Sequence, residues 1–239
     1  MFERHQLAQL GLGTALLAGS FAAPASAFML NSTTGTWSNV QGGANIQFVT
    51  VGDESQVRWG EAATTAGSSG LGFTGVGALD FAAETVFQIG TLRHFNNPIF
   101  GGTAAAAVDL SLNLDFADLG LKSFDFTLTI DETPNSGTCT YFSVTPCADK
   151  IAWTNSLAAQ TFQVDGVDYT LELLGVRESL SGSLLANFIS QEGGTSAAFL
   201  VARLTDVTPA PPNSIPEPGL LLGLGAITTF VVTHRRPSS

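Results

Sequence analysis

Alternation of apolar and polar residues along two neighbouring segments constrains the fold of this chain more than any other feature. In residues 108–116 the even-numbered positions are apolar: Val108, Leu110, Leu112, Leu114 and Phe116. The odd-numbered positions between them are polar. Residues 122–130 repeat the pattern, with apolar Phe124, Phe126, Leu128 and Ile130. Side chains alternate between the two faces of a strand, so each segment is predicted to bury one face and to expose the other. This half-buried pattern is typical of antiparallel sheets.

A tight hairpin is predicted at Asp165-Gly166, which lies between two segments of the same alternation. Asp-Gly tolerates the positive φ angles of a type I′ turn, whose twist matches that of the flanking strands. The glycine-rich residues 67–77 are expected to form a flexible loop. Further strands are expected at residues 35–40, 45–51, 55–59, 84–93, 149–154, 184–190 and 196–206. About ten short strands with glycine-rich turns predict an all-β domain, an antiparallel β-sandwich of jelly-roll type.

The charge of the chain limits its partners. The formal net charge is −11. The predicted β-domain, residues 28–207, contains few basic residues: Arg58, Arg93, Lys122, Lys150, Arg177 and Arg203. Such an acidic surface is a poor partner for nucleic acid and for anionic membrane surfaces. It is compatible with divalent cations and with solubility outside the cell.

The N-terminus has the features of a secretory signal peptide, predicted to span residues 1–27. A polar start with Arg4 is followed by the apolar stretch from Leu7 to Gly19 and then by Ala25-Ser26-Ala27, an A-x-A cleavage site. The apolar stretch is short for a transmembrane helix, although an uncleaved anchor is the alternative. The mature chain is expected to begin near Phe28.

The C-terminus, residues 215–239, combines three elements. Pro216-Glu217-Pro218 comes first, then the uncharged stretch from Gly219 to Val232, and then Arg235-Arg236. As a helix the stretch spans roughly 21 Å, against a bilayer core of roughly 30 Å, so it is predicted to form a short transmembrane helix in a locally thinned membrane. Basic residues stay on the cytoplasmic side, which places the β-domain outside. The proline-rich residues 208–214 are expected to be a linker.

This tail resembles the PEP-CTERM sorting signal, in which the same three elements occur in the same order. The resemblance implies export through the inner membrane of a bacterium with a Gram-negative-type envelope, and recognition by an exosortase. It also implies sorting to the cell surface or into an extracellular exopolysaccharide matrix, with transient contact between the C-terminal segment and the inner membrane. An ordinary C-terminal tail anchor is the alternative. The final Pro237-Ser238-Ser239 departs from the family pattern.

The β-domain is similar to the THxN and choice-of-anchor groups of PEP-CTERM proteins. The similarity lies within residues 84–176 and rests on "FQIGTLRHFNNPIF", "IDETPN" with the cysteine pair after it, "ADKI" and "DYTLELLG". The Thr-His-x-Asn core is matched by His94 and Asn96, and the Asn-Pro-Ile element by Asn97-Pro98-Ile99, whereas Arg93 replaces the threonine. The similarity implies an extracellular β-domain and no particular activity.

Two cysteines, Cys139 and Cys147, lie close together in the sequence. Export makes a disulfide the expected state, and the chain-entropy model assigns a loop this short about 2–3 kcal/mol of stability. A metal pair is the alternative, but two thiolates without a nearby histidine make only half a zinc site.

The sequence does not indicate a catalytic site. The histidine of the β-domain is His94, since His5 lies in the signal peptide and His234 in the tail. A Ser-His-Asp triad would also need a serine elbow such as G-x-S-x-G, which the sequence lacks. His94 and Asn96 are therefore expected to be structural, with side chains that hydrogen-bond the backbone where the strand ends before Pro98.

Calcium is the cofactor that the sequence leaves open, with Asp131, Glu132 and Asn135 as candidate ligands. Oxygen ligands close together suit Ca²⁺, which takes six to eight of them, although the spacing is not that of an EF-hand loop. The alternative is a solvated hairpin tip, for which Pro134 and Gly137 supply the turn chemistry.

These features predict an exported surface or extracellular-matrix protein with a structural or adhesive role and no catalysis. A carbohydrate-binding module of an exopolysaccharide matrix is the alternative. It would need a tryptophan on an exposed sheet face to stack on sugar rings, and the candidates are Trp37, Trp59 and Trp153. Tryptophans in strands are more often core residues. A hydrolase is the third interpretation, and the missing serine elbow counts against it.

Overall fold

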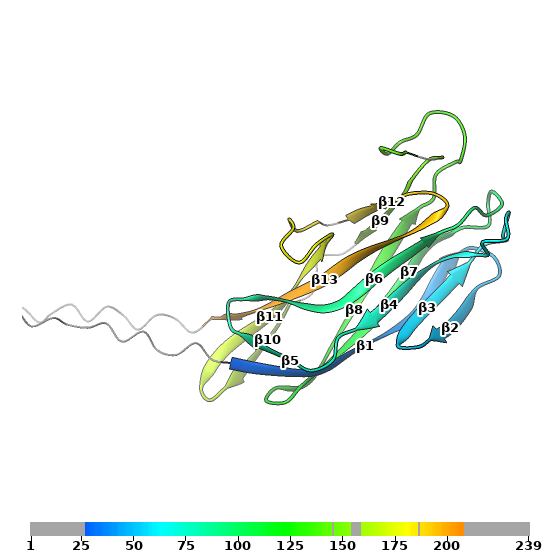
Figure 1. The fold of residues 1–239 in the computed structure, drawn as a ribbon. Coiled ribbons are helices and arrows are strands. Elements are labelled where there is room, and N and C mark those ends of the chain that lie inside the picture. Colours follow the sequence, from blue (N-terminus) through cyan, green and yellow to red (C-terminus); the bar gives the residue numbers. More distant parts are fainter. Residues whose placement is uncertain (1–26, 145, 154–158, 186, 208–239) are drawn as a thin grey trace, which may run out of the picture.

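The computed structural model describes residues 27–144, 146–153, 159–185 and 187–207. Thirteen strands lie in these residues and form two antiparallel sheets, whose facing side chains share one apolar core. The described part is elongated, and its long strands run along its length (Figure 1). The prediction of an all-β domain with antiparallel sheets is confirmed for these residues.

The six-stranded sheet has the order β12-β9-β8-β7-β1-β5. The strand expected at residues 35–40 is part of β1, which begins much earlier, and β5 has no counterpart among the expected strands. The strands are β1 (Ala27–Gly42), β5 (Leu79–Ala82), β7 (Ala105–Phe116), β8 (Gly120–Asp131), β9 (Asp149–Trp153) and β12 (Asn187–Ser190).

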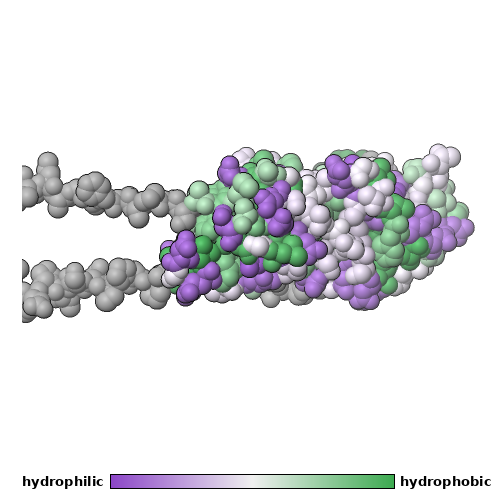
Figure 2. Space-filling model, turned by 90° about the horizontal axis from the view of Figure 1, so that it is seen from below, coloured by the Kyte–Doolittle hydropathy of each residue, from purple (hydrophilic) through white to green (hydrophobic). Residues whose placement is uncertain are grey.

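The seven-stranded sheet has the order β10-β11-β13-β6-β4-β3-β2. Its strands are β2 (Gln47–Val51), β3 (Glu54–Trp59), β4 (Ser69–Gly75), β6 (Val86–Asn96), β10 (Ala159–Val164), β11 (Val167–Arg177) and β13 (Gly194–Asp206). On the face shown in Figure 2, hydrophilic and hydrophobic residues are interspersed. This mixture is expected where the outward positions of strands meet solvent.

The alternation that predicted β7 and β8 places one face of each strand in the core. The two strands pair so that Leu110 lies opposite Phe126, and Leu112 lies opposite Phe124. These four side chains are at most 3 % exposed, while Asp125 between the two phenylalanines is exposed. The predicted face assignment is therefore confirmed.

The predicted hairpin joins β10 to β11. Val164 pairs with Val167, which leaves Asp165 and Gly166 as a two-residue loop. Their φ angles are 51° and 83°, the left-handed values that a type I′ turn requires at both positions. This prediction is confirmed as well.

The prediction of a flexible loop at residues 67–77 is wrong, because most of this segment is strand β4, which lies between β3 and β6. Leu71 and Phe73 are buried in the core, and the glycines alternate with them. At Gly72 a Cβ atom would collide with the buried carboxylate of Glu54 on β3. Glycine therefore permits close packing here, which composition alone cannot distinguish from flexibility.

The two ends of the domain carry different side chains. The proximal end, where Ala27 and Val207 lie, is filled by aromatic rings: Phe28, Phe81, Phe87, Phe116 and Tyr169. At the distal end β8 runs into the disulfide loop, residues 132–148, and β12 turns into β13 through residues 191–193. Figure 1 shows the disulfide loop projecting beyond the strands at the end away from Ala27.

The predicted signal peptide, apart from Ala27, and the predicted linker and sorting tail lie outside the described residues. In the part of the chain that the structure describes, no helix is long and apolar enough to cross a membrane.

Candidate functional site

Three carboxyl groups meet at the distal end of the domain. Glu132 follows the last residue of β8, Asp149 is the first residue of β9, and Glu192 lies in the turn between β12 and β13. Strand β9 pairs with β8 on one side and with β12 on the other, which brings these distant parts of the chain together. Carboxylate oxygens of the three residues lie within 4.8 Å of one another. We call these three residues the carboxyl cluster.

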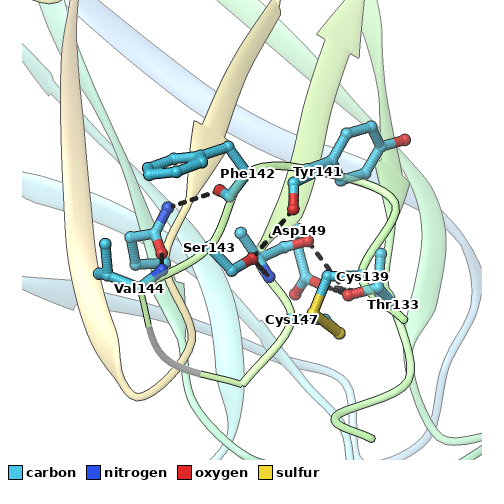
Figure 3. Close-up of a disulfide and its surroundings, with 10 residues drawn as sticks. Thr133, Cys139, Tyr141, Phe142, Ser143, Val144, Cys147 and Asp149 are labelled. Carbon is cyan, nitrogen blue, oxygen red and sulfur yellow. Dashed lines mark hydrogen bonds between the residues drawn. A yellow bond between two sulfur atoms is a disulfide. The ribbon is translucent and has the colours of Figure 1, made fainter. Parts of the chain in front are cut away.

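Thr133 fixes the orientation of Asp149. The Oδ1 atom of Asp149 accepts a hydrogen bond from the backbone N–H of Thr133 at 2.8 Å, and the Thr133 hydroxyl lies 3.2 Å away. Figure 3 shows the two residues side by side, next to the disulfide. The Oδ2 atom of Asp149 accepts no N–H or hydroxyl bond from the described residues. Its carboxyl group can bond to that of Glu132 only when one of them carries a proton.

The predicted disulfide is present and braces the loop that leads into β9. Cys139 and Cys147 are joined, with their Cα atoms 5.0 Å apart. Cys147 is buried and precedes Asp149 by two residues. The bond therefore holds the loop against the start of β9, directly beside the carboxyl cluster.

Gln191 connects the disulfide loop to the turn that carries Glu192. Its side-chain oxygen accepts a hydrogen bond from the N–H of Val144 at 3.0 Å. Its amide group donates to the carbonyl oxygen of Phe142 at 3.2 Å (Figure 3). The loop is thus tied to both segments that supply buried carboxyl groups.

Burial raises the pKa of all three carboxyl groups. For Glu132 burial is the largest cause, and the negative charges of Asp149 and Glu192 raise its pKa further. Burial also raises the pKa of Asp149, while the hydrogen bonds from Thr133 oppose the shift. Burial raises the pKa of Glu192 to about 7, with the charge of Asp149 acting in the same direction and the polar side chain of Asn135 opposing it. The cluster therefore favours proton uptake or a bound cation at neutral pH.

Among the described residues, neither Glu132 nor Asp149 forms an ion pair with a basic side chain. Lys150 follows Asp149 in β9 and so points to the opposite face of the strand. Its ammonium group lies 5.0 Å from the ring centroid of Tyr141. The ion pairs Arg93–Glu54 and Arg203–Glu172 lie away from the carboxyl cluster.

Access to the cluster is narrow. A hollow of about 270 Å³ is lined by residues 132–135 on one side and by residues 99–102 and Ala104 on the other. Asp149 is fully buried, and Glu192 is 6 % exposed. A glycoside hydrolase needs two carboxyl groups that face a cleft open to the sugar chain, which these side chains do not provide. A proton or a small ion fits such a place, but a polymer does not.

The structure separates the three residues that the sequence marked as calcium candidates. Glu132 belongs to the carboxyl cluster, and Asn135 is near enough to Glu192 to lower the pKa of that carboxyl group. Asp131 is exposed and accepts a hydrogen bond from the hydroxyl of Tyr141 instead. Neighbouring residues of an extended segment face opposite sides. The side chains of Asp131 and Glu132 therefore point in different directions.

Two members of the cluster were not among the predicted site residues. Asp149 had a usable signal, since it shares its parity with Ile151 and Trp153 in a segment expected to be a strand, and so faces the core. Glu192 had none, because a single acid in "SQEGGT" is typical of a solvated turn.

The Thr-His-x-Asn-like segment lies in β6 and has a structural role. The side chain of Asn96 donates to the carbonyl oxygen of Ser190 at 2.9 Å, which confirms the expected backbone contact for that residue. His94 is fully buried beside Trp59, with ring centroids 6.2 Å apart, and its nitrogens make no hydrogen bond with described residues. The expected backbone contact of His94 is therefore wrong. Burial, aided by the charge of Arg58, lowers its pKa to about 3.

The described tryptophans do not form an exposed platform for sugars. Trp37 and Trp59 are buried in the core. Trp153 is half-buried and packs edge-on against Phe126, with ring centroids 5.1 Å apart. Core packing, the more frequent role of tryptophan in strands, accounts for all three side chains.

The comparisons with known proteins add no family. No family model matches this chain, and no curated protein matches its sequence. The candidate function therefore rests on the sequence patterns and on the geometry described above.

Proposed function

We propose that the chain is an exported, exosortase-sorted protein with a structural or adhesive role and no catalytic activity. Its signal peptide directs export through the inner membrane of a Gram-negative-type bacterium. An exosortase then processes the tail, and the β-domain remains at the cell surface or in the exopolysaccharide matrix. Sorting is supported by the order of the tail elements: Pro216-Glu217-Pro218, the apolar stretch and Arg235-Arg236.

The observation that carries the adhesive role is the position of the disulfide loop relative to Val207. The N–H of Val207 donates to Asp168 at 2.8 Å, at the proximal end where Tyr169 packs against Phe28. The disulfide loop lies at the distal end (Figure 1). Strand β8 has 12 residues and, at about 3.4 Å per residue, separates the two ends by roughly 40 Å. A tail that holds Val207 near a membrane therefore points the loop away from it.

The disulfide loop presents apolar side chains in a braced conformation. Phe142 is 84 % exposed and Val144 is 75 % exposed. The disulfide and the two hydrogen bonds with Gln191 hold their backbone in place. A pre-ordered loop loses less conformational entropy when it binds a surface, and exposed apolar side chains supply contact area.

We also infer the jelly-roll type for the two sheets. The support is the repeated passage of the chain between them: β1 and β5 belong to the six-stranded sheet, whereas β2 to β4 and β6 belong to the other. The carbohydrate-binding alternative has less support, because the tryptophans that it would use are packed against the core. Binding of the exported protein to a glycan array would favour that alternative.

Sorting is tested by changing the tail. In a host with an exosortase, Glu217→Ala should leave the chain unprocessed in the inner membrane with its tail attached. Deletion of residues 219–239 should release soluble, unsorted protein. Intact mass and cell fractionation distinguish these states. If the wild-type chain keeps Arg235-Arg236 at the surface and Glu217→Ala fractionates identically, the tail is a permanent anchor and the sorting proposal fails.

Adhesion is tested at the distal loop. The number of attached cells should fall roughly threefold or more when the cells display the Phe142→Ser, Val144→Ser double variant in place of the wild-type chain. The reason is that exposed apolar anchors dominate contact energies. Leu121→Ser is the matched control, since Leu121 is 63 % exposed at the proximal end. Equal attachment by wild type and double variant at equal surface amounts would refute the adhesive role of the loop.

A further inference from the structure

The spacing of the carboxyl cluster fits a shared cation. Calcium lies about 2.3–2.6 Å from its oxygen ligands, so two ligands on opposite sides of one ion are up to about 5 Å apart. The oxygens offered by Glu132, Asp149 and Glu192 are all within 4.8 Å of one another. One ion placed between them can therefore contact all three without a movement of the backbone.

An independent observation at the same place is an unsatisfied hydroxyl group. Ser190 is fully buried, and its Oγ atom has no hydrogen-bond partner among the described residues. In the antiparallel register Ser190 pairs with Asp149. Paired residues point to the same face, with Cβ atoms about 4.5–5.5 Å apart. The hydroxyl thus lies beside the carboxyl group of Asp149 and offers a neutral oxygen to the same space.

The cluster also has the supporting contacts that metal ligands require. Thr133 holds Oδ1 of Asp149 and leaves Oδ2 without an N–H or hydroxyl donor from the described residues. Such hydrogen bonds fix ligands in place before the metal arrives. The hollow lined by residues 132–135 gives an ion a path to Glu132.

The donor atoms select the kind of cation. The cluster and Ser190 offer oxygen, and no imidazole or free thiol lies among them. Zinc and other transition metals prefer nitrogen and sulfur ligands, whereas calcium takes oxygens in flexible geometry from separate parts of a chain. We propose that Glu132, Asp149 and Glu192 bind one calcium ion, which fastens the disulfide loop to the turn between β12 and β13. This site depends neither on sorting nor on adhesion.

Calcium binding is measured on the full chain, purified after export with its disulfide formed and stripped of metal with EDTA. Titration calorimetry with CaCl₂ should show one site per chain, with MgCl₂ binding at least about tenfold more weakly because Mg²⁺ demands tighter octahedral geometry. At a calcium concentration about 100 times the Kd, the Tm should rise by about 5–10 °C. A folded protein that binds no calcium at millimolar concentration would overturn the proposal.

Two conservative variants and one matched control locate the site. Glu132→Gln and Glu192→Gln should each weaken calcium binding about tenfold or more, since each removes one charged ligand. Asp131→Asn is the control, because Asp131 is exposed next to Glu132 but bonds to Tyr141. Unchanged binding in the control supports the assignment. An equal loss in Asp131→Asn would show non-specific attraction by acidic residues and would overturn it.

A second readout separates a calcium ligand from a residue that merely supports the fold. In EDTA at pH 8 the Glu192→Gln variant should melt at a higher temperature than the wild type, because it removes a buried charge from a cluster of like charges. In calcium the order should reverse. A variant that melts lower than the wild type in both conditions by the same amount would assign Glu192 a structural role and contradict the proposal.

Discussion

The proximal and distal ends of the domain close the space between the sheets in opposite ways. At the proximal end Phe81 stacks on Phe87, with ring centroids 3.9 Å apart, and lies 5.8 Å from the ring of Phe28. At the distal end the buried groups include polar side chains, among them Asp149 and Glu192. An aromatic group fills one end, and the other end concentrates negative charge.

This difference predicts which conditions each end responds to. Apolar side chains need no hydrogen-bond partner, and their packing responds little to pH or to ions. A buried polar or charged group destabilises the fold unless it is bonded or neutralised. The distal end should therefore depend on its charge state, on the disulfide and, under the proposal above, on calcium, while the proximal end should not.

The largest effect is expected at the proximal end, from Phe81→Ala. Loss of a buried phenylalanine from a packed aromatic group should cost about 3–5 kcal/mol of unfolding free energy, measured by denaturant melts. The loss should be the same in EDTA and in calcium. Asp80→Ala is the control, because Asp80 is the exposed neighbour in β5, and it should change stability by less than about 0.5 kcal/mol. A loss of unfolding free energy that differs between EDTA and calcium would contradict the expected difference between the two ends.

The disulfide tests the distal end. The Cys139→Ser, Cys147→Ser double variant should lose about 2–3 kcal/mol of unfolding free energy, because the unfolded chain is no longer constrained by the closed loop. Mass analysis of an unreduced tryptic digest should find the two cysteines joined in the exported wild-type chain. Free thiols at both positions would contradict the structure at this end.

His94 gives the distal half of the core a dependence on pH. Its pKa is about 3 in the folded protein and about 6.5 in an unfolded chain. The unfolded state therefore takes up a proton that the folded state does not, and stability falls as the pH drops from about 6.5 toward 3. Between pH 6.5 and 4.5 this loss amounts to about 2 kcal/mol.

The measurement compares urea melts of the wild type and of His94→Leu at the two pH values. The variant should lack that part of the acid sensitivity, while other titrating groups affect both proteins alike. Arg58 on β3 is the charged group that acts on His94, and it stays charged throughout. Parallel pH profiles for the two proteins would show that His94 is not held neutral by burial.

The smallest effect is expected in the proximal hairpin. Gly166→Ala should cost about 1 kcal/mol, because alanine disfavours a φ angle of 83°. No atom lies within 4 Å of the added Cβ there or at Gly77, whose backbone angle is ordinary. Gly77→Ala should therefore be neutral or slightly stabilising. Similar melting shifts in the two variants would indicate that backbone strain does not control this turn.

Local patterns determined a large part of the fold. The period-two alternation identified β7 and β8 and their buried faces, because strand geometry fixes the side of each residue without reference to neighbours. Asp165-Gly166 identified its hairpin because the turn requires positive φ angles at both positions. Cys139 and Cys147 were paired from their short separation and the expected export.

Tertiary structure alone decided the rest. Residues 69–75 form an interior strand because Gly70 and Gly72 let β3 approach closely, a contact that depends on the packing of neighbouring strands. The carboxyl cluster exists because β9 lies between β8 and β12. Strand order is set by the packing of the whole core, so the meeting of Glu132 with Glu192 leaves no trace in the local sequence around either residue.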